Sequence, residues 1–371
     1  MSDATAVPAS AAPSSIRAGL LRALLAAVLF GASAPLAKGL LADVRPQMLA
    51  GLLYLGSGLG LLVVWLARRV RAGRGHAAAE APLTRADAPW LAGAIAAGGV
   101  LGPLLLMIGL SRTPASSASL LLNLEGVFTA LLAWFVFREN FDRRIALGMV
   151  AIVAGGALIS WTGRAELGGL VGPVAIAGAC LCWAVDNNLT QKVSAGDPVQ
   201  ITMLKGLTAG AVNTGIAFAS GSHLPTAWRV AASMGLGFVS YGLSLVLFVL
   251  ALRALGTART GAYFSTAPFV GAALSLVVWR DPITLPLVLG GACMAAGVWL
   301  HVSERHEHEH THEALEHEHL HVHDEHHQHA HAPGDPPVSG PDEPHSHRHR
   351  HEPMVHTHAH VPDIHHRHGH D

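Results

Sequence analysis

Charge is scarce in this sequence. Only 13% of the 371 residues are Asp, Glu, Lys or Arg, about half of the share in typical soluble domains, while 51% are hydrophobic. Three cysteines, Cys180, Cys182 and Cys293, lie in apolar stretches without C-x-x-C spacing, so we expect small core residues rather than a disulfide or metal set. No nucleophile elbow, P-loop, H-E-x-x-H or dinucleotide fingerprint is present. The sequence therefore predicts neither an enzyme nor an ATP-driven pump.

Histidine is scarce too, except at one end of the chain. Residues 301–371 hold 24 of the 26 histidines and carry a formal charge of −10, whereas residues 1–300 carry +9. The overall charge of −1 is thus a cancellation, and we expect no nucleic-acid partner. The contrast predicts an apolar body followed by a polar tail.

Long apolar runs fill the body. Ten of them have the length that crosses a bilayer, with nine or eleven spans as the alternatives, so the sequence predicts an all-α integral membrane protein with the lipid bilayer as its surroundings. The first run follows Arg17 and looks like a signal peptide, but a repeat within the chain requires it, so we expect an uncleaved helix. The expected spans are 20–41, 47–67, 89–110, 115–137, 145–162, 170–191, 198–220, 230–252, 257–279 and 283–302.

Basic residues set the expected orientation of these spans. With the N-terminus inside, the inner connections hold 13 Lys or Arg residues and the outer connections hold 6. Positive residues favour the cytoplasmic side, and an even number of spans returns the chain to the side where it began. We therefore expect both termini to be cytoplasmic, in a multi-pass protein of the cell inner (plasma) membrane.

An internal repeat divides the body. Residues 109–139 align without gaps with residues 251–281, and each segment ends one span, makes a short polar turn, crosses again and stops at an Arg-acid pair. Five spans per half is an odd number, so the halves must have opposite orientations in the membrane. Inverted repeats are an architecture of secondary transporters, with the site near the midplane between them.

These features carry a family resemblance. Two five-helix halves, each with a small-residue turn into a span that closes on an acidic residue, resemble the EamA family of the drug/metabolite transporter superfamily over about residues 20–302. The resemblance implies transport of a small molecule without naming the substrate. The second half fits the family at Ala267-Pro268, where a mid-helix proline is common. The first half differs, because Glu125-Gly126 occupies the matching positions.

Glu125 is the most informative residue of the body. It lies in Leu120–Phe137, an apolar stretch with no other charge, where a carboxylate should cost ~2.5–3.5 kcal/mol on insertion scales. Such residues usually face a bundle interior or a water-filled path. One interpretation is that Glu125 binds a substrate cation or a coupling proton. The other is that it is protonated, or hydrogen-bonded to Asn123 or a neighbouring helix, and only packs.

Asp186 and Lys205 are a second pair of charges within spans. Asp186 lies ~9 Å and Lys205 ~10 Å from the inner end of consecutive helices, counted at helical rise. Matching depth favours pairing, either as a gate that responds to substrate or as a structural ion pair.

Other polar and aromatic side chains accompany these charges. Asn187 and Asn188 follow Asp186 directly, and amides in lipid need partners, so they either line a polar path or join helices. Trp183 and Tyr241 either form an aromatic wall of a cavity or belong to the packing.

The tail is marked by histidines that alternate with other residues. Neutral imidazole is a good ligand for Zn, Ni, Cu and Co, so we expect several weak, exchanging sites whose affinity falls below about pH 6. Few apolar residues predict disorder. A tail with no cellular role and a pH-sensing tail are the alternatives. The candidate ligands are His306, His308, His310, His312, His317, His319, His321, His323, His345, His347, His349, His351, His356, His358 and His360.

The sequence thus predicts a disordered N-terminus (1–18), a first EamA-like repeat (19–162), a second repeat (163–302) and a disordered cytoplasmic tail (303–371). The favoured function is export or exchange of a small metabolite by alternating access, coupled to an ion or proton. The alternatives are a divalent-metal transporter with the tail as collector or sensor, and a metal- or pH-sensing membrane protein that does not transport. No cofactor is required, apart from divalent metals that the tail could bind, and a homodimer is left open.

Overall fold

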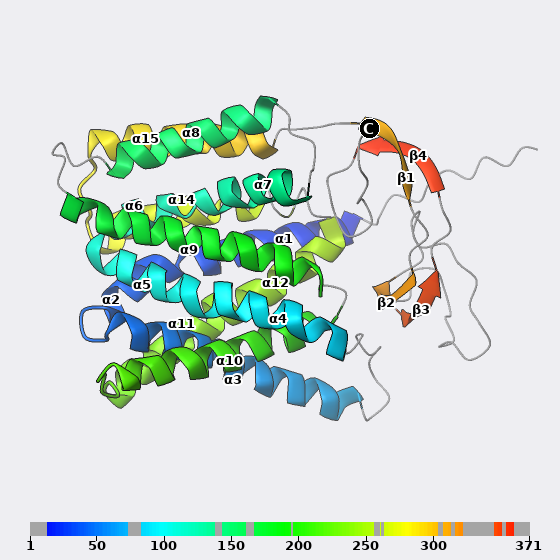
Figure 1. The fold of residues 1–371 in the computed structure, drawn as a ribbon, viewed down its shortest axis with the longest axis horizontal. Coiled ribbons are helices and arrows are strands. Elements are labelled where there is room, and N and C mark those ends of the chain that lie inside the picture. The colour runs from blue at the N-terminus through cyan, green and yellow to red at the C-terminus, as the bar shows by residue number, and fades with distance from the viewer. Residues whose placement is uncertain are drawn as a thin grey trace, which may run out of the picture.

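The computed structural model describes most of the chain between Pro13 and Ala359. The described residues are 13–72, 83–137, 143–160, 167–193, 196–255, 260, 263–302 and four strands in the tail. Residues 13–302 form helices and turns only, within these described ranges, and the helices run roughly side by side (Figure 1). The predicted all-α body is confirmed at this level.

The first half of the body contains eight described α-helices. They are α1 (Pro13–Gly31), α2 (Ser33–Leu40), α3 (Pro46–Ala72), α4 (Ala88–Ala94), α5 (Gly102–Arg112), α6 (Ala115–Leu121), α7 (Leu124–Phe137) and α8 (Arg143–Ser160). A short 3₁₀ turn, η1 (Arg85–Asp87), leads into α4, and a π-helix, η2 (Ile95–Leu101), joins α4 to α5. Helix α1 begins at Pro13, and residues 1–12 of the N-terminus that was predicted to be disordered lie outside the described part.

The second half follows the same succession. Its described α-helices are α9 (Leu167–Gln191), α10 (Pro198–Ala219), α11 (Ala227–Gly237), α12 (Ser244–Leu255), α14 (Ala267–Val278) and α15 (Leu285–Val302). A second π-helix, η3 (Phe238–Leu243), joins α11 to α12. Leu101 ends the first π-helix, and Leu243, which the offset of the sequence repeat pairs with Leu101, ends the second.

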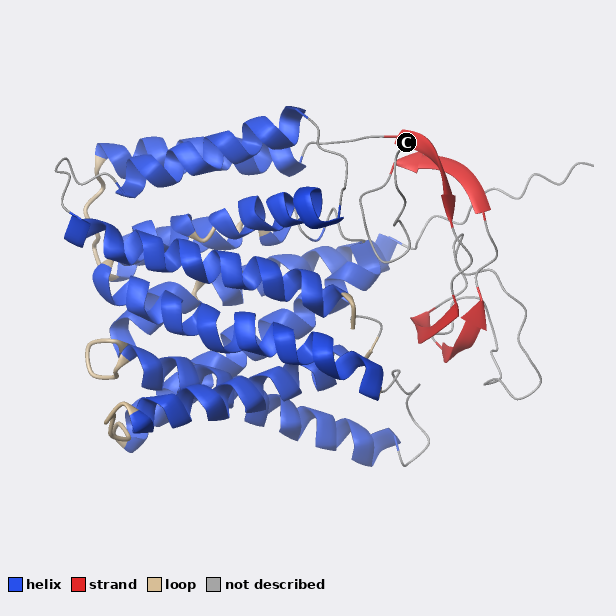
Figure 2. Cartoon of the chain, in the orientation of Figure 1, coloured by secondary structure: helices blue, strands red, loops and turns tan. Residues whose placement is uncertain are grey.

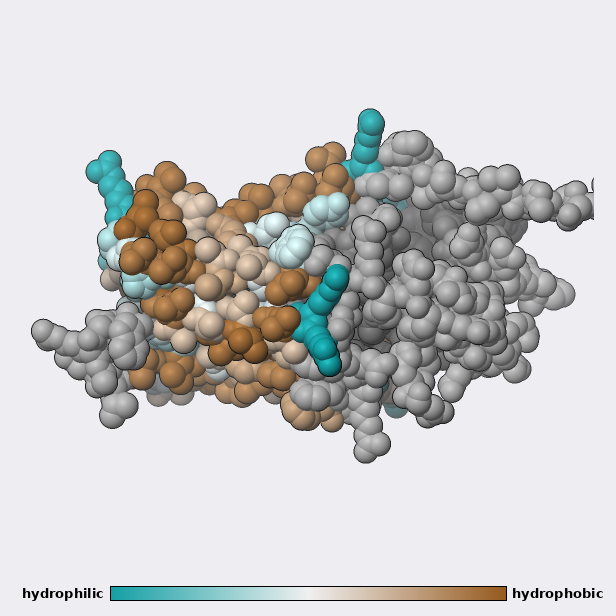
Figure 3. Space-filling view, turned by 90° about the horizontal axis from the view of Figure 1, so that it is seen from above, coloured by the Kyte–Doolittle hydropathy of each residue, from teal (hydrophilic) through white to brown (hydrophobic). Residues whose placement is uncertain are grey.

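Helices long and apolar enough to cross a membrane dominate the body. Among the described residues there are six, and three shorter apolar helices accompany them: Ala146–Ser160, Ala267–Val278 and Leu285–Leu300. Helix α10, of 22 residues, carries Lys205 in its interior. Apolar side chains cover much of the face in Figure 3, and large exposed ones include Val63, Phe135 and Val277. A surface of this kind suits lipid rather than water.

The packing of the helices pairs the two halves. Helix α3 lies along α10, α8 lies along α15, and α6 packs on α14. The contact between α5 and α9 has a counterpart between α12 and α1. Gly58 and Gly206 permit the close approach of α3 and α10, because a Cβ atom on Gly206 would lie 2.5 Å from the backbone nitrogen of Gly58.

Four short strands are described in the tail (Figure 2): β1 (Glu307–His312), β2 (Glu316–His321), β3 (His345–Arg350) and β4 (Met354–Ala359). β1 pairs antiparallel with β4, and β2 pairs antiparallel with β3. The predicted disorder of residues 303–371 stays a prediction. The rest of the tail lies outside the described residues.

Candidate functional site

One face of helix α9 carries a row of polar and aromatic residues. Asp186 and Asn187 lie three and four residues after Trp183, and Thr190 lies four and three residues after them, which places all four on the same side of a helix. Each of them bonds to a group on another segment or to a neighbour in this row. The row therefore connects α9 to several helices inside the apolar body.

The charged centre of this row is a buried ion pair. The Nζ atom of Lys205 lies 2.6 Å from Oδ1 and 2.8 Å from Oδ2 of Asp186. The Thr190 hydroxyl donates to Oδ1 at 2.8 Å and lies 3.1 Å from the Lys205 amine. Both charged side chains are only 9% exposed. The predicted pairing of Asp186 with Lys205 is confirmed, and it joins α9 to α10.

The carboxylate of Asp186 rests against the π-helix η2. A Cβ atom on Gly98 would lie 2.0 Å from Oδ2 of Asp186, so the backbone can come this close only at a glycine. The carbonyl of Gly98 accepts hydrogen bonds from the Tyr54 hydroxyl at 2.9 Å and from Trp183 Nε1 at 3.0 Å. The side chain of Asn213 donates to the next carbonyl, that of Gly99, at 2.9 Å. Single-turn π-helical segments occur often at functional sites, and here three other helices hold one.

Glu125 lies at an interruption of its span. Helix α6 ends at Leu121 and α7 begins at Leu124, so Glu125 is in the first turn of α7. The partial positive charge at the start of a helix favours a carboxylate there, and transporter sites often use such broken helices. The Asn187 amide donates to Oε1 of Glu125 at 2.7 Å. Glu125 is half-buried and Asn187 is exposed, so this pair borders open space.

Glu125 differs from the other described carboxylates in its partners. Within the described part of the chain, no cation pairs with Glu125, and its recorded partner is a neutral amide. The other carboxylates have an ion-pair or capping role there: Asp186 pairs with Lys205, Asp43 with Arg229, Asp281 accepts from Ser116, Asp197 from Val199 and Asp87 from Thr84. Among these carboxylates of the described body, Glu125 thus differs in having a neutral side-chain amide as its recorded partner.

Aromatic rings from both halves meet beside α9. The ring of Phe30 lies 6.4 Å from Trp183 and 6.0 Å from Tyr241, measured between centroids. Tyr54 and Tyr241 are 5.5 Å apart, and Phe264 is 5.4 Å from Phe30. Trp183 and Tyr241, both predicted as aromatic wall or packing, thus belong to one cluster between the halves.

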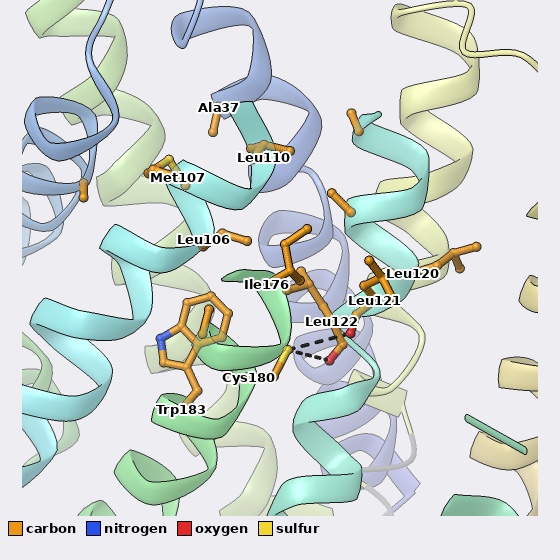
Figure 4. Close-up of a cluster of buried hydrophobic side chains, with 14 of the residues drawn as sticks. Ala37, Leu106, Met107, Leu110, Leu120, Leu121, Leu122, Ile176, Cys180 and Trp183 are labelled. Carbon is orange, nitrogen blue, oxygen red and sulfur yellow. Dashed lines mark hydrogen bonds between the residues drawn. The ribbon is translucent and has the colours of Figure 1, made fainter. Parts of the chain in front are cut away.

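A buried apolar cluster supports the interruption at Glu125. Figure 4 shows Leu121, Leu122, Ile176 and Cys180 between α9 and the end of α6. The Cys180 thiol lies 3.7 Å from the carbonyl of Leu121 and 3.9 Å from that of Leu122. These carbonyls lie where the helix is interrupted, so the thiol partly replaces hydrogen bonds that a continuous helix would supply. The expectation that Cys180 is a core residue is confirmed.

The chain matches the model of a known protein family. The model of the EamA-like transporter family matches the chain twice, at residues 17–161 and at residues 170–303. This chain belongs to the EamA-like transporter family. With its apolar helices, it is a multi-pass membrane protein and a membrane transporter.

Relatives of this EamA-like transporter align with most of its length. An uncharacterized transporter of Methanothermobacter thermautotrophicus is 28% identical over 299 residues, which cover 76% of this chain and 85% of the relative. The uncharacterized transporter YvbV of Bacillus subtilis is 25% identical over 283 residues, with coverage of 74% and 88%. A solved crystal structure shares the fold at a TM-score of 0.56 and 17% identity, covering 78% of this chain and 98% of that chain.

Two of the predicted asparagines have recorded partners other than Glu125. The Asn123 amide donates to the Leu120 carbonyl at 2.9 Å, and the Asn188 amide donates to Ala184 at 2.8 Å. Both bonds stay within three or four residues of the chain. The Asn123 amide also contacts the Met294 sulfur of α15 at 4.0 Å, whereas Asn187 is the asparagine that bonds to Glu125.

Lys38 joins α2 to the C-terminal end of α5 in this EamA-like transporter. Its Nζ atom donates to the carbonyls of Leu110 and Thr113, at the end of α5. A cation near the C-terminal end of a helix is favourable because of the orphan carbonyls there. At the same end, Asp281 accepts from the backbone and hydroxyl of Ser116 at 2.9 and 2.8 Å.

The structure bears differently on candidate metal ligands in the body and in the tail. Among the described residues, no group of three or more His, Cys, Asp or Glu is placed to hold a metal ion. Of the predicted tail ligands, His306, His323, His351 and His360 lie outside the described residues, and the others lie in strands of which only the backbone is described.

Proposed function

We propose that this protein moves a small metabolite across the membrane by alternating access, with Glu125 as the group that binds the coupling proton or the positive charge of the substrate. The observation that carries the proposal is the environment of Glu125. The carboxylate lies in the first turn of α7 with a neutral amide as its recorded partner, and the described residues offer it no cation. A site of this kind gains a cation or a proton more readily than a carboxylate already neutralised, as Asp186 is by Lys205.

The architecture proposed for this transport is ten spans in two inverted five-helix repeats. Four observations support it. The family model matches twice, and the two π-helices occur at equivalent positions of the halves. The contact of α5 with α9 has its equivalent in the contact of α12 with α1, and the equivalent spans of both halves are interrupted. The second interruption is the turn at Ser265–Thr266 before α14, which matches the turn before α7. Alternating access in such folds is a rocking of one repeat against the other around a fixed site.

The driving force proposed is an ion or proton gradient, because the sequence contains no ATP-binding motif. We propose that the direction is export or exchange and that both termini are cytoplasmic in the inner membrane, on the basis of 13 inner against 6 outer basic residues. A metal cargo is less favoured, because the described body offers no three-ligand group.

Transport in inverted vesicles tests this proposal. Vesicles with and without the protein would be given a panel of labelled amino acids, amines and other small metabolites, with and without an uncoupler that collapses the proton gradient. We expect protein-dependent accumulation of at least one compound, and loss of that accumulation with the uncoupler. Equal uptake of every compound in vesicles that lack the protein would contradict the proposal.

A further inference from the structure

One end of the helical body is joined by polar contacts that cross between the two halves of the chain. Helix α2 lies at this end, together with the turns that join α10 to α11 and α14 to α15 (Figure 1). We call it the α2 end. Two separate sets of contacts between the halves occur there, and neither is part of the polar row on α9.

The first set comes from the segment that follows α14. The Nε1 atom of Trp279 donates to the carbonyl of Pro35 in α2 at 2.9 Å. Asp281 accepts from the backbone N–H and the hydroxyl of Ser116 at 2.9 and 2.8 Å. Between these two residues, Arg280 has a φ of 51°, in the left-handed region that residues other than glycine seldom adopt. Backbone strain of this kind concentrates at functional and switch regions, and here it lies between two residues that both bond to the first half.

The bond from Ser116 to Asp281 supplies an acceptor that α6 lacks within its own half. The residue before α6 is Pro114, whose side chain cannot accept a hydrogen bond. Ser116 is buried, so its N–H needs a partner in the protein while this end is closed. Lys38 donates to the carbonyl of Thr113, directly before this turn, at 2.9 Å. The second half therefore completes the start of α6, and water could replace it only if the α2 end opened.

The second set lies on the α11 side of the same end. Arg229 of α11 pairs with Asp43, and Arg45 donates to the carbonyl of Ser220 at 3.4 Å. This set shares no residue with the first. The side chains of Arg229 and Asp43 are partly exposed, and exposed ion pairs contribute little singly. Contacts of this strength can hold the end together as a group and still be broken without unfolding the body.

We propose that the two sets form a latch that closes the α2 end and that they break together when the transporter opens there. The position of the Glu125 site supports this. Helix α9 begins at the α2 end, and Asn187, the partner of Glu125, is exposed and lies in the last two turns of α9, toward the opposite end. In the topology proposed above, the α2 end is the outer one. The latch rests on the proposed function, because alternating access requires each end to open in turn.

Hydrogen–deuterium exchange of the full-length protein in detergent tests the latch without any substrate. Asp281→Ala removes the acceptor of Ser116, a hydrogen bond to a charged group, so exchange in residues 115–118 should become about tenfold faster or more. Exchange in residues 220–230 should rise as well, because opening exposes the whole end. By the reciprocity of coupled sites, Arg229→Gln should speed exchange in residues 115–118. This second variant decides the question if Asp281→Ala does not fold.

The matched control is Asp197→Ala. Asp197 accepts from the N–H of Val199 at 2.9 Å, which is the second residue of α10 as Ser116 is of α6, but both partners belong to the second half. This variant should speed exchange only at the start of α10. A rise confined to the start of α6 in Asp281→Ala, or a rise at the α2 end in the control, would overturn the latch. The vesicle assay can fail or succeed independently of this result, because exchange is measured without transport.

Discussion

At the scale of single residues, two carboxylates near one another have different partners. Asp186 is neutralised by Lys205 in a nearly dry contact, while Glu125 is bonded to Asn187, the residue next to Asp186 in the chain. A paired carboxylate fixes two helices to each other, and an unpaired one can exchange its ligand. We therefore propose a structural role for Asp186 and Lys205 and the coupling role for Glu125.

The structural role of Asp186 and Lys205 predicts a particular pattern of stabilities. Asp186→Ala or Lys205→Ala leaves one buried charge alone, which should cost about 3–5 kcal/mol, whereas the double variant removes both charges and should be closer to the wild type. Thermal unfolding in detergent measures this. Thr190→Val is the control, since it removes only a hydroxyl and should cost about 0.5–1.5 kcal/mol. Strictly additive losses would show that the two charges do not depend on each other.

The sequence allowed part of this site to be predicted. The contact of Asp186 with Lys205 followed from their matching depth on consecutive helices, which the chain encodes directly. The choice of Asn187 rather than Asn123 as partner of Glu125 depends on how α9 is rotated against α7, and no local pattern determines that rotation. The part played by Tyr54 was missed, because its acceptor is a backbone carbonyl that only the π-helix leaves available.

At the scale of elements, the π-helix η2 depends on a residue without a side chain. Gly98→Ala would place a methyl group against the Asp186 carboxylate, so the ion pair or the helix must shift. Overpacking typically costs 1–3 kcal/mol, and we expect such a loss in thermal unfolding together with reduced transport.

The matched control for that variant is Gly215→Ala in α10. A Cβ atom at Gly215 meets nothing within 4 Å, and alanine favours a helix over glycine by up to about 1 kcal/mol. Gly215→Ala should therefore be neutral or stabilising. Equal behaviour of the two variants would mean that the contact between Gly98 and Asp186 has no energetic importance.

Most helices, but not their irregularities, were predictable from the sequence. Nine of the ten expected spans coincide with described helices over most of their length, and α14 accounts for part of 257–279. Hydrophobicity identifies such segments because lipid requires every backbone group to be bonded internally. Hydrophobicity carries no information on π-helices. For η2, the only local feature in the sequence is the pair Gly98-Gly99. In the tail, the period of two was visible in the sequence, whereas the pairing of β1 with β4 and of β2 with β3 joins distant stretches that no local pattern relates.

At the scale of the whole molecule, the orientation in the membrane determines where the tail operates. From the excess of inner basic residues and the proposed even number of spans, we propose that the tail lies in the cytoplasm. Protease added to inside-out vesicles should therefore remove the tail, and protease added to right-side-out vesicles should leave it intact. Cleavage only from the outside would overturn the proposed topology.

The central claim is that Glu125 couples transport to protonation or to a cationic substrate. Its most direct test uses the compound identified in the vesicle panel, with purified protein in proteoliposomes under an imposed pH gradient. Wild-type protein and Asp87→Asn, the same chemical change at a carboxylate that only caps a turn, should accumulate the compound in proportion to the gradient. Glu125→Gln keeps the shape and removes ionisation, so it should insert normally, accumulate nothing against a gradient and show no dependence on pH. Full, pH-dependent accumulation by Glu125→Gln would contradict the account.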